Sequence, residues 1–448
     1  MAELTRSATD DPDLGAEPAS VVRRAPFSDN PVVGARGQKA QQRILEAALR
    51  VFGEVGYHQT GIVRITEVAG CSRASFYQYF SSKEDVFRRL AGDVARALAA
   101  SAAELPVVGP DADGWQALRE WTGRYADIYD RYEPVFQAFQ AAAESDEAVA
   151  SGSVRLEHRH VGRLHEKVAG AATLPPAHLD AAINVLLNCV TRTQRMTGVL
   201  RSAMPSGALP RASVDAALAD IWHRTLFGLD PAVNVQPPPA RSTVRVRHSA
   251  SIVRDLVADT TEPELTPSGT RTLNALLDAA HQVLAKRGYH GTRIDDITDV
   301  AGMSHGAFYR YFDNKEEVVR LLALRAIRRV GQAFDEIPAI DAGPQARRGW
   351  LERYASAHAT ETALIRVWVD ATADDPLLRV ESAAALDWGR ARLVRVLHPR
   401  GFGDVDLDAL LLVVLLDTIG AQPRSADVLD ACALVVERAL LGVSETAR

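Results

Sequence analysis

Two stretches of this 448-residue chain decide its fold because they are closely similar to each other. Residues 56–84 read GYHQTGIVRITEVAGCSRASFYQYFSSKE, and residues 288–316 read GYHGTRIDDITDVAGMSHGAFYRYFDNKE. The likeness runs without a gap over residues 45–90 and 277–322, at a constant offset of 232 positions, and roughly half of the positions are identical. Self-similarity at a fixed spacing is the signature of repeated structural units. The sequence therefore predicts two copies of one unit.

Each copy has the pattern of a helix-turn-helix. In the first copy, apolar residues recur at helical spacing over residues 38–55, which predicts an amphipathic helix that Gly56 ends. A second helix is predicted over residues 62–68 and a third over residues 73–80. Between these two, Gly70 can adopt the left-handed backbone that a sharp turn needs. This pattern predicts a three-helix head whose third helix can reach DNA.

Polar residues mark the starts of the third and fourth helices. Ser72 can cap the third helix, and Ser81 or Ser82 can cap a fourth helix that opens with Lys83. Because a lysine at a helix start opposes the helix dipole, this lysine is expected to meet an anion such as a DNA phosphate. The local charge also favours a contact with DNA. Between residues 36 and 90 there are nine basic and five acidic residues, although the net charge of the whole chain is −6.

The helical pair, followed in both copies by Phe-Tyr-x-Tyr-Phe-x-x-Lys-Glu, resembles the TetR family of transcriptional regulators. The resemblance implies an all-α fold of two consecutive units, each a three-helix helix-turn-helix head followed by a helical regulatory domain. It also implies a repressor that leaves its double-stranded DNA operator when a small apolar effector binds. Thr66 and Thr298 stand where the family commonly has alanine, a departure that concerns packing more than recognition.

The resemblance carries the family's DNA-contact positions onto both copies. In the first copy they are Thr60, Ser72, Arg73, Ser75, Tyr77, Gln78, Tyr79 and Lys83, and in the second copy Thr292, Ser304, His305, Ala307, Tyr309, Arg310, Tyr311 and Lys315. Arg73 could read a guanine or meet a phosphate, and the tyrosines could equally be partly buried packing residues. Because the two sets differ in the side chains that would read bases, we expect unlike half-sites and an operator that is not a good palindrome.

The regulatory part beyond each head is expected to be helical throughout. Aromatic residues and regularly spaced polar side chains indicate either a small-molecule pocket or an aromatic core. The candidate pocket residues are Trp121, Tyr125, Tyr129, Phe136, Asn184 and Asn188 in the first copy, and Trp350, Tyr354 and Trp368 in the second. In the second copy, the aliphatic helix over residues 407–416 favours an interface or a packed core over a pocket.

The repeat and the local composition divide the chain. We expect a disordered tail (1–36), a first head (37–90), a first regulatory domain (91–229), a Pro-rich basic linker (230–269), a second head (270–322) and a second regulatory domain (323–448). A flexible linker of about 40 residues spans on the order of 35 Å, which is comparable with the roughly 34–36 Å between successive major-groove half-sites. The two copies are therefore expected to pair within one chain as a pseudo-twofold dimer, and further self-association stays open.

Other classes of protein are less well supported. The polar start has no apolar signal segment, and the longest apolar run (residues 409–416) is too short to cross a bilayer, so we expect a cytoplasmic protein with no membrane partner. We find no catalytic motif and expect no enzyme activity, cofactor or metal. His158, His160 and His165 are expected on a solvated charged face rather than around a metal. The main alternative is a regulator in which only one head binds DNA and the other half is a dimerisation scaffold.

Overall fold

The structure of the protein is a computed structural model. The structure describes residues 34–203, 209–228, 233, 265–339, 341–398, 403–422 and 425–441. The predicted tail at 1–36 and linker at 230–269 therefore lie almost entirely outside the described residues. The part of the chain that is described contains helices and no strand, so the predicted all-α fold is confirmed.

The described part of the first unit contains eight helices. Its head is formed by α1 (Ala35–Gln59), α2 (Ile62–Ala69) and α3 (Arg73–Tyr79), and its remaining helices are α4 (Lys83–Glu104), α5 (Ala112–Ser145), α6 (Glu147–Val168), α7 (Pro176–Ala203) and α8 (Arg211–Phe227). The predicted second and third helices of the head agree with α2 and α3 to within a residue. Helix α1 begins at Ala35, two residues before the predicted start of the head.

The second unit repeats this order. Its head is formed by α11 (Pro267–Gly291), α12 (Ile294–Ala301) and α13 (His305–Phe308), followed by α14 (Lys315–Asp335), α15 (Pro344–Asp374), α16 (Pro376–Leu397), α17 (Val405–Gly420), α18 (Ala426–Val436) and the π-helical turn η4 (Glu437–Leu441). Helix α11 begins three residues before the predicted start of the head, because Thr266 caps it by accepting a hydrogen bond from the Gly269 amide.

Glycines shape both heads where the sequence requires them. Gly70 and Gly302 end the second helix of each head with φ angles of 61° and 64°, in the left-handed region that side-chain-bearing residues avoid. Gly56 and Gly288 leave the helical conformation near the end of α1 and α11, with φ angles of 76° and 67°. The helix-turn-helix of both units therefore depends on glycines with positive φ angles at equivalent positions.

The buried side chains form two separate cores. The larger core joins the first head and the first unit's later helices to the late helices of the second unit, with Trp222 and Leu411 among its members. The smaller core belongs to the second head, to α14 and to parts of α15 and α16, and includes Phe308 and Trp368. The second unit therefore contributes to both cores, whereas the first unit lies in one.

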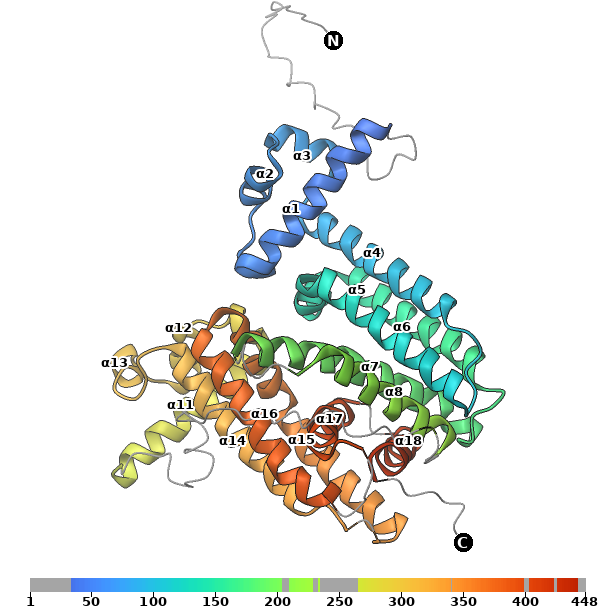
Figure 1. The fold of residues 1–448 in the computed structure, drawn as a ribbon. Coiled ribbons are helices and arrows are strands. Elements are labelled where there is room, and N and C mark those ends of the chain that lie inside the picture. Colours follow the sequence, from blue (N-terminus) through green and yellow to red (C-terminus); the bar gives the residue numbers. More distant parts are fainter. Residues whose placement is uncertain are drawn as a thin grey trace, which may run out of the picture.

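The two units meet through their last helices. Helix α7 packs against α17 and α18, and α8 packs against η4 and α17, as the green and red helices of Figure 1 show. Leu410, Leu411 and Leu415 of α17 are almost fully buried there. The expectation that residues 407–416 form an interface or packed core is confirmed. None of the helices described here is both long and apolar enough to span a bilayer.

Candidate DNA interface

The third helix of each head begins at a capping serine. Ser72 Oγ accepts a hydrogen bond from the Ser75 amide at 3.1 Å, and Ser304 Oγ accepts one from the Ala307 amide at 3.3 Å. Each cap satisfies a backbone donor that the helix itself leaves without a partner. The predicted cap of α3 by Ser72 is therefore confirmed, and Ser304 caps α13 in the same way. In the first unit Ser82 rather than Ser81 caps α4.

Aromatic side chains hold α3 against its head. Phe76 and Phe80, four positions apart, are fully buried, as their spacing predicts. Arg73 and Gln78 lie on the exposed side of the helix. Ser75, Tyr77 and Tyr79 are half-buried, and the two tyrosines pack against the core. The exposed side of α3 thus offers a guanidinium and an amide, the two groups that read guanine and adenine most specifically.

The equivalent segment of the second head is shorter and less basic. Helix α13 has four residues, where α3 has seven. Tyr309 is 53% exposed, Arg310 is exposed, and Ala307 and Tyr311 are half-buried. His305 Nε2 pairs with the carboxylate of Asp295 on α12. An acidic partner therefore sits beside a candidate base-contacting residue of this head.

Two threonines among the candidate contacts are buried. The Thr60 hydroxyl donates to the Gly56 carbonyl at 2.7 Å, and the Thr292 hydroxyl donates to the Gly288 carbonyl at 2.7 Å. Both bonds close the loop between the first and second helices of a head. The structure therefore gives these threonines a positioning role in the loop.

Lys83 and Lys315 contact carbonyl oxygens within their own heads. Lys83 Nζ donates to the carbonyls of Tyr57 at 2.9 Å and His58 at 3.4 Å, and Lys315 Nζ donates to that of Tyr289 at 2.7 Å. Each ammonium also lies over a tyrosine ring, 4.5 Å from the Tyr57 centroid and 3.9 Å from that of Tyr289. Burial lowers the pKa of Lys83.

These contacts explain why a lysine can open a helix here. The carbonyls that the two lysines contact lie just beyond Gly56 and Gly288, where the backbone leaves the helical conformation, and they accept hydrogen bonds from the ammonium groups. Each lysine thereby ties the end of the first helix of a head to the start of the fourth. The sequence indicated an anion near these lysines, but its spacing could not reveal a carbonyl partner 26 residues away. The phosphate contact stays a prediction.

The two heads differ in charge. Between residues 36 and 90 there are nine lysines and arginines and five acidic residues, whereas between residues 268 and 322 there are seven of each. Three of the latter acids, Asp295, Asp296 and Asp299, lie on α12. A phosphate backbone therefore attracts the first head more strongly than the second.

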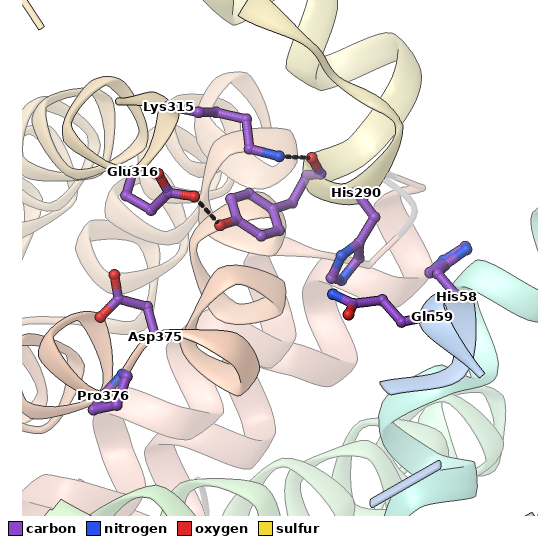
Figure 2. A pocket seen from close by; sticks show the side chains of 8 residues that line it. His58, Gln59, His290, Lys315, Glu316, Asp375 and Pro376 are labelled. Atoms are coloured by element: carbon purple, nitrogen blue, oxygen red, sulfur yellow. Dashed lines mark hydrogen bonds between the residues drawn. The ribbon is translucent and has the colours of Figure 1, made fainter. Parts of the chain in front are cut away.

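The heads touch each other at equivalent positions. The rings of His58 and His290, which occupy the same place in the two Gly-Tyr-His motifs, lie with their centroids 5.1 Å apart. An open pocket of about 640 Å³ lies beside them, and Figure 2 shows its polar lining. It is lined by His58, Gln59, Tyr289, His290, Lys315, Glu316, Asp375 and Pro376. The recurrence of the motif was the only sequence signal for this contact.

The candidate pocket residues of the first unit lie in its core. Trp121, Tyr125 and Tyr129 are buried, and Phe136 stacks on Tyr129 with ring centroids 4.8 Å apart. The hydroxyls of Tyr125 and Thr191 lie 2.6 Å apart. On α7, the side-chain amide of Asn188 donates to that of Asn184 at 2.6 Å, so these two candidates hydrogen-bond each other.

The candidates of the second unit do not share a site. Trp350 and Tyr354 belong to the larger core, whereas Trp368 belongs to the smaller one. The indole of Trp350 donates to the Ala333 carbonyl at 2.8 Å, and that of Trp368 donates to the Ser382 hydroxyl at 3.1 Å. These contacts favour packing roles for the tryptophans.

The expectation of a solvated histidine face on α6 is wrong for His160. This residue is 6% exposed, and its ring lies 6.5 Å from that of Trp121. His160 shares the four-residue spacing of the buried Leu164 and Val168, which places all three on the inner face of α6. His158, two positions earlier, is exposed. In the part of the chain that is described, no three metal-ligating side chains converge.

Comparison with known proteins identifies the family. The model of the family described as "Bacterial regulatory proteins, tetR family" matches residues 44–90 and 276–322. The HTH-type transcriptional repressor AcnR of Corynebacterium diphtheriae is 32% identical over 135 residues, 29% of this chain and 70% of that protein. The HTH-type transcriptional regulator EthR of Mycolicibacterium smegmatis is 28% identical over 170 residues, 37% of this chain and 78% of that protein. The chain belongs to the TetR family, and it carries the family's helix-turn-helix twice.

A solved structure also matches. A TetR-family transcriptional regulator from Streptomyces coelicolor is 21% identical, with a TM-score of 0.31, over 41% of this chain and 82% of that one.

Proposed function

We propose that this chain is a transcriptional repressor that binds one DNA operator with both of its heads and leaves it when a small apolar effector binds. The observation that carries the proposal is the exposed polar face of α3, with Arg73 and Gln78, on the basic first head of a chain that carries the helix-turn-helix twice. Repression is supported by the relative AcnR, whose name describes it as a repressor.

The packing of the units supports an intramolecular pseudo-dimer. Helices α7 and α8 of the first unit lie against α17, α18 and η4 of the second, so that the last helices of both units form one bundle. The contact between His58 and His290 relates the heads through equivalent positions, as a pseudo-twofold axis requires. The heads α1–α3 and α11–α13 also project on the same side of the bundle in Figure 1. A single chain then supplies both halves of an operator-binding unit.

A second candidate is a regulator in which the first head supplies nearly all of the DNA affinity. The observations that favour it are the neutral charge balance of the second head and the pairing of His305 with Asp295. In that case the second head acts mainly as a scaffold that holds the first one.

The experiment that tests both candidates is selection of bound duplexes from a random DNA pool by the full chain, followed by binding assays on the selected duplex. Arg73→Ala is expected to weaken binding by about 1–3 kcal/mol and to relax sequence preference at one half-site. If both heads read DNA, Arg310→Ala is expected to weaken binding and to relax sequence preference at the other half-site, whose sequence differs from the first.

The control is Arg395→Ala on α16, a side chain that is 71% exposed and lies outside both heads. Loss of affinity with Arg73→Ala but not with Arg310→Ala would favour the single-head candidate. A pool that yields no preferred sequence would contradict the proposed function.

Buried ring nitrogens without a hydrogen-bond partner in the first unit support an effector site there. The indole nitrogens of Trp121 and Trp222 and Nε2 of His160 are buried and have no hydrogen-bond partner. Their rings are in contact, with the Trp222 centroid 5.1 Å and the His160 centroid 6.5 Å from that of Trp121. A buried donor without an acceptor costs free energy. A ligand with an apolar body and a carbonyl or carboxylate oxygen would recover that cost.

A thermal-shift screen of apolar carbonyl compounds tests this site. A bound compound is expected to raise the melting temperature of the wild type and to release the selected duplex. Trp222→Phe keeps the aromatic contact but removes a donor, so it is expected to weaken such a compound about tenfold. Trp350→Phe, whose indole is already bonded within the second unit, is the matched control. Equal affinity in the Trp222→Phe variant and the wild type would exclude this site.

A further inference from the structure

We propose that charge specifies which surfaces pair in this chain, because the first unit contributes arginines and the second unit contributes aspartates to the contact between them. The partner that fits the first unit is then the second unit, and not another first unit from a second chain. This inference rests on the proposed pairing of the two units within one chain.

The first charge pair lies between α7 and α17. Arg192 of the first unit pairs with the carboxylate of Asp417 of the second, and His358 Nε2 of α15 lies 3.1 Å from the same carboxylate. Burial alone would raise the pKa of Asp417, but Arg192 and His358 together lower it to about 2. The carboxylate is therefore ionised whenever the units are in contact near neutral pH.

The second charge pair lies deeper, between α8 and α17. Arg224 of the first unit is fully buried, and Asp408 of the second has a side chain that is 3% exposed. The closest nitrogen and oxygen of the pair are 4.0 Å apart. A guanidinium in such a place is stable only with compensating groups close by, because leaving it buried without them is costly.

In the reverse direction, an arginine of the second unit contacts neutral oxygens of the first unit. Arg438 of η4 donates to the Thr173 hydroxyl at 2.8 Å and to the Thr173 carbonyl at 3.3 Å, both neutral acceptors of the first unit. The two ion pairs described above therefore both run from a first-unit arginine to a second-unit aspartate.

This polarity discriminates against pairing of like units. Two identical surfaces meet so that each contributes the same groups to the other. First units paired in this way would leave Arg192 and the buried Arg224 without their aspartates, and second units would leave Asp417 and the buried Asp408 without their arginines. The leucines of α17 supply attraction to any apolar partner, so the discrimination comes from charge. A tethered second unit also meets the first at high effective concentration.

The test uses the full chain with a protease site placed within residues 234–264, cut after folding. The wild-type halves are expected to stay together as one complex of unlike halves, observed by native mass spectrometry. Arg192→Asp and Asp417→Arg each place like charges together and are expected to weaken the association of the halves at least about tenfold. The exchange R192D/D417R is expected to restore it to near the wild-type value. Arg155→Asp, an exposed site on α6, makes the same change of charge away from the contact and should have no effect.

Other outcomes would overturn the inference. Single reversals without effect would show that charge does not matter, and reversals that the exchange fails to rescue would assign the effect to packing. Complexes of two like halves from the cut wild type would contradict it directly. DNA binding by the uncut protein is measured separately. If the halves pair as expected but the uncut protein selects no preferred DNA sequence, the proposed function is refuted and the inference on charge is not. Halves of the wild type that separate at once on cutting would refute the pairing itself.

Discussion

Replacing Arg347 with alanine is expected to lower the free energy of unfolding by about 3–5 kcal/mol. Arg347 Nε donates to Glu437 Oε1 at 2.6 Å, and both side chains are only 7% exposed. This bond joins α15 to η4, the element that packs on α8 of the first unit. The alanine variant leaves the Glu437 carboxylate buried without its guanidinium. The change is measured as a shift of the denaturation midpoint in urea.

Two further variants separate this pair from the general loss of an arginine. Arg353→Ala removes an exposed arginine from the same helix and is expected to change stability by less than about 0.5 kcal/mol. Arg347→Met combined with Glu437→Leu replaces both charges by apolar groups and is expected to regain most of the lost stability. A loss below about 1 kcal/mol in Arg347→Ala would show that Glu437 is compensated by other groups.

Acidification from pH 6.5 to pH 4 is expected to destabilise the protein by about 3 kcal/mol through His160 alone. Burial, assisted by the charge of Arg163, lowers the pKa of His160 from 6.5 to about 4. The unfolded chain therefore binds a proton in this range that the folded chain does not. The free energy of unfolding is therefore not lowered by His160 above pH 6.5. It falls as the pH drops from 6.5 towards 4, and this group changes it little below pH 4.

The measurement is the urea midpoint as a function of pH. His160→Phe keeps an aromatic ring beside Trp121 but removes the titrating group, so its stability should depend less steeply on pH between 6.5 and 4. His158→Phe, at an exposed position of the same helix, should keep the wild-type slope. Identical slopes in wild type and His160→Phe would contradict the assignment.

Sequence reasoning predicted the heads well because their structure is local. The turn glycines Gly70 and Gly302 and the capping serines Ser72 and Ser304 act within four residues of their own positions. Each of these residues also occurs at the equivalent position of both copies, so the pattern is not a coincidence.

Features that depend on partners far away in the sequence could not be predicted from the sequence. The carbonyls that hold Lys83 belong to another helix, and the ring that buries His160 belongs to α5. Trp350 and Trp368 are alike in sequence terms, yet they lie in different cores because α15 is long enough to reach both. Periodicity identifies an inner face of a helix, but it does not say which neighbour that face meets.

The shared core of α7, α8, α17 and η4 has a consequence for behaviour at low copy number. A regulator assembled from two separate chains loses its active form on dilution, because the concentration of pairs falls with the square of the number of chains. Two heads carried on one polypeptide are made together in a fixed one-to-one ratio. Under the proposed pairing within one chain, operator occupancy at low copy number rises in direct proportion to the number of chains, with no assembly threshold. The two heads are also free to diverge in sequence, as α3 and α13 have done, without producing mixed species in the cell.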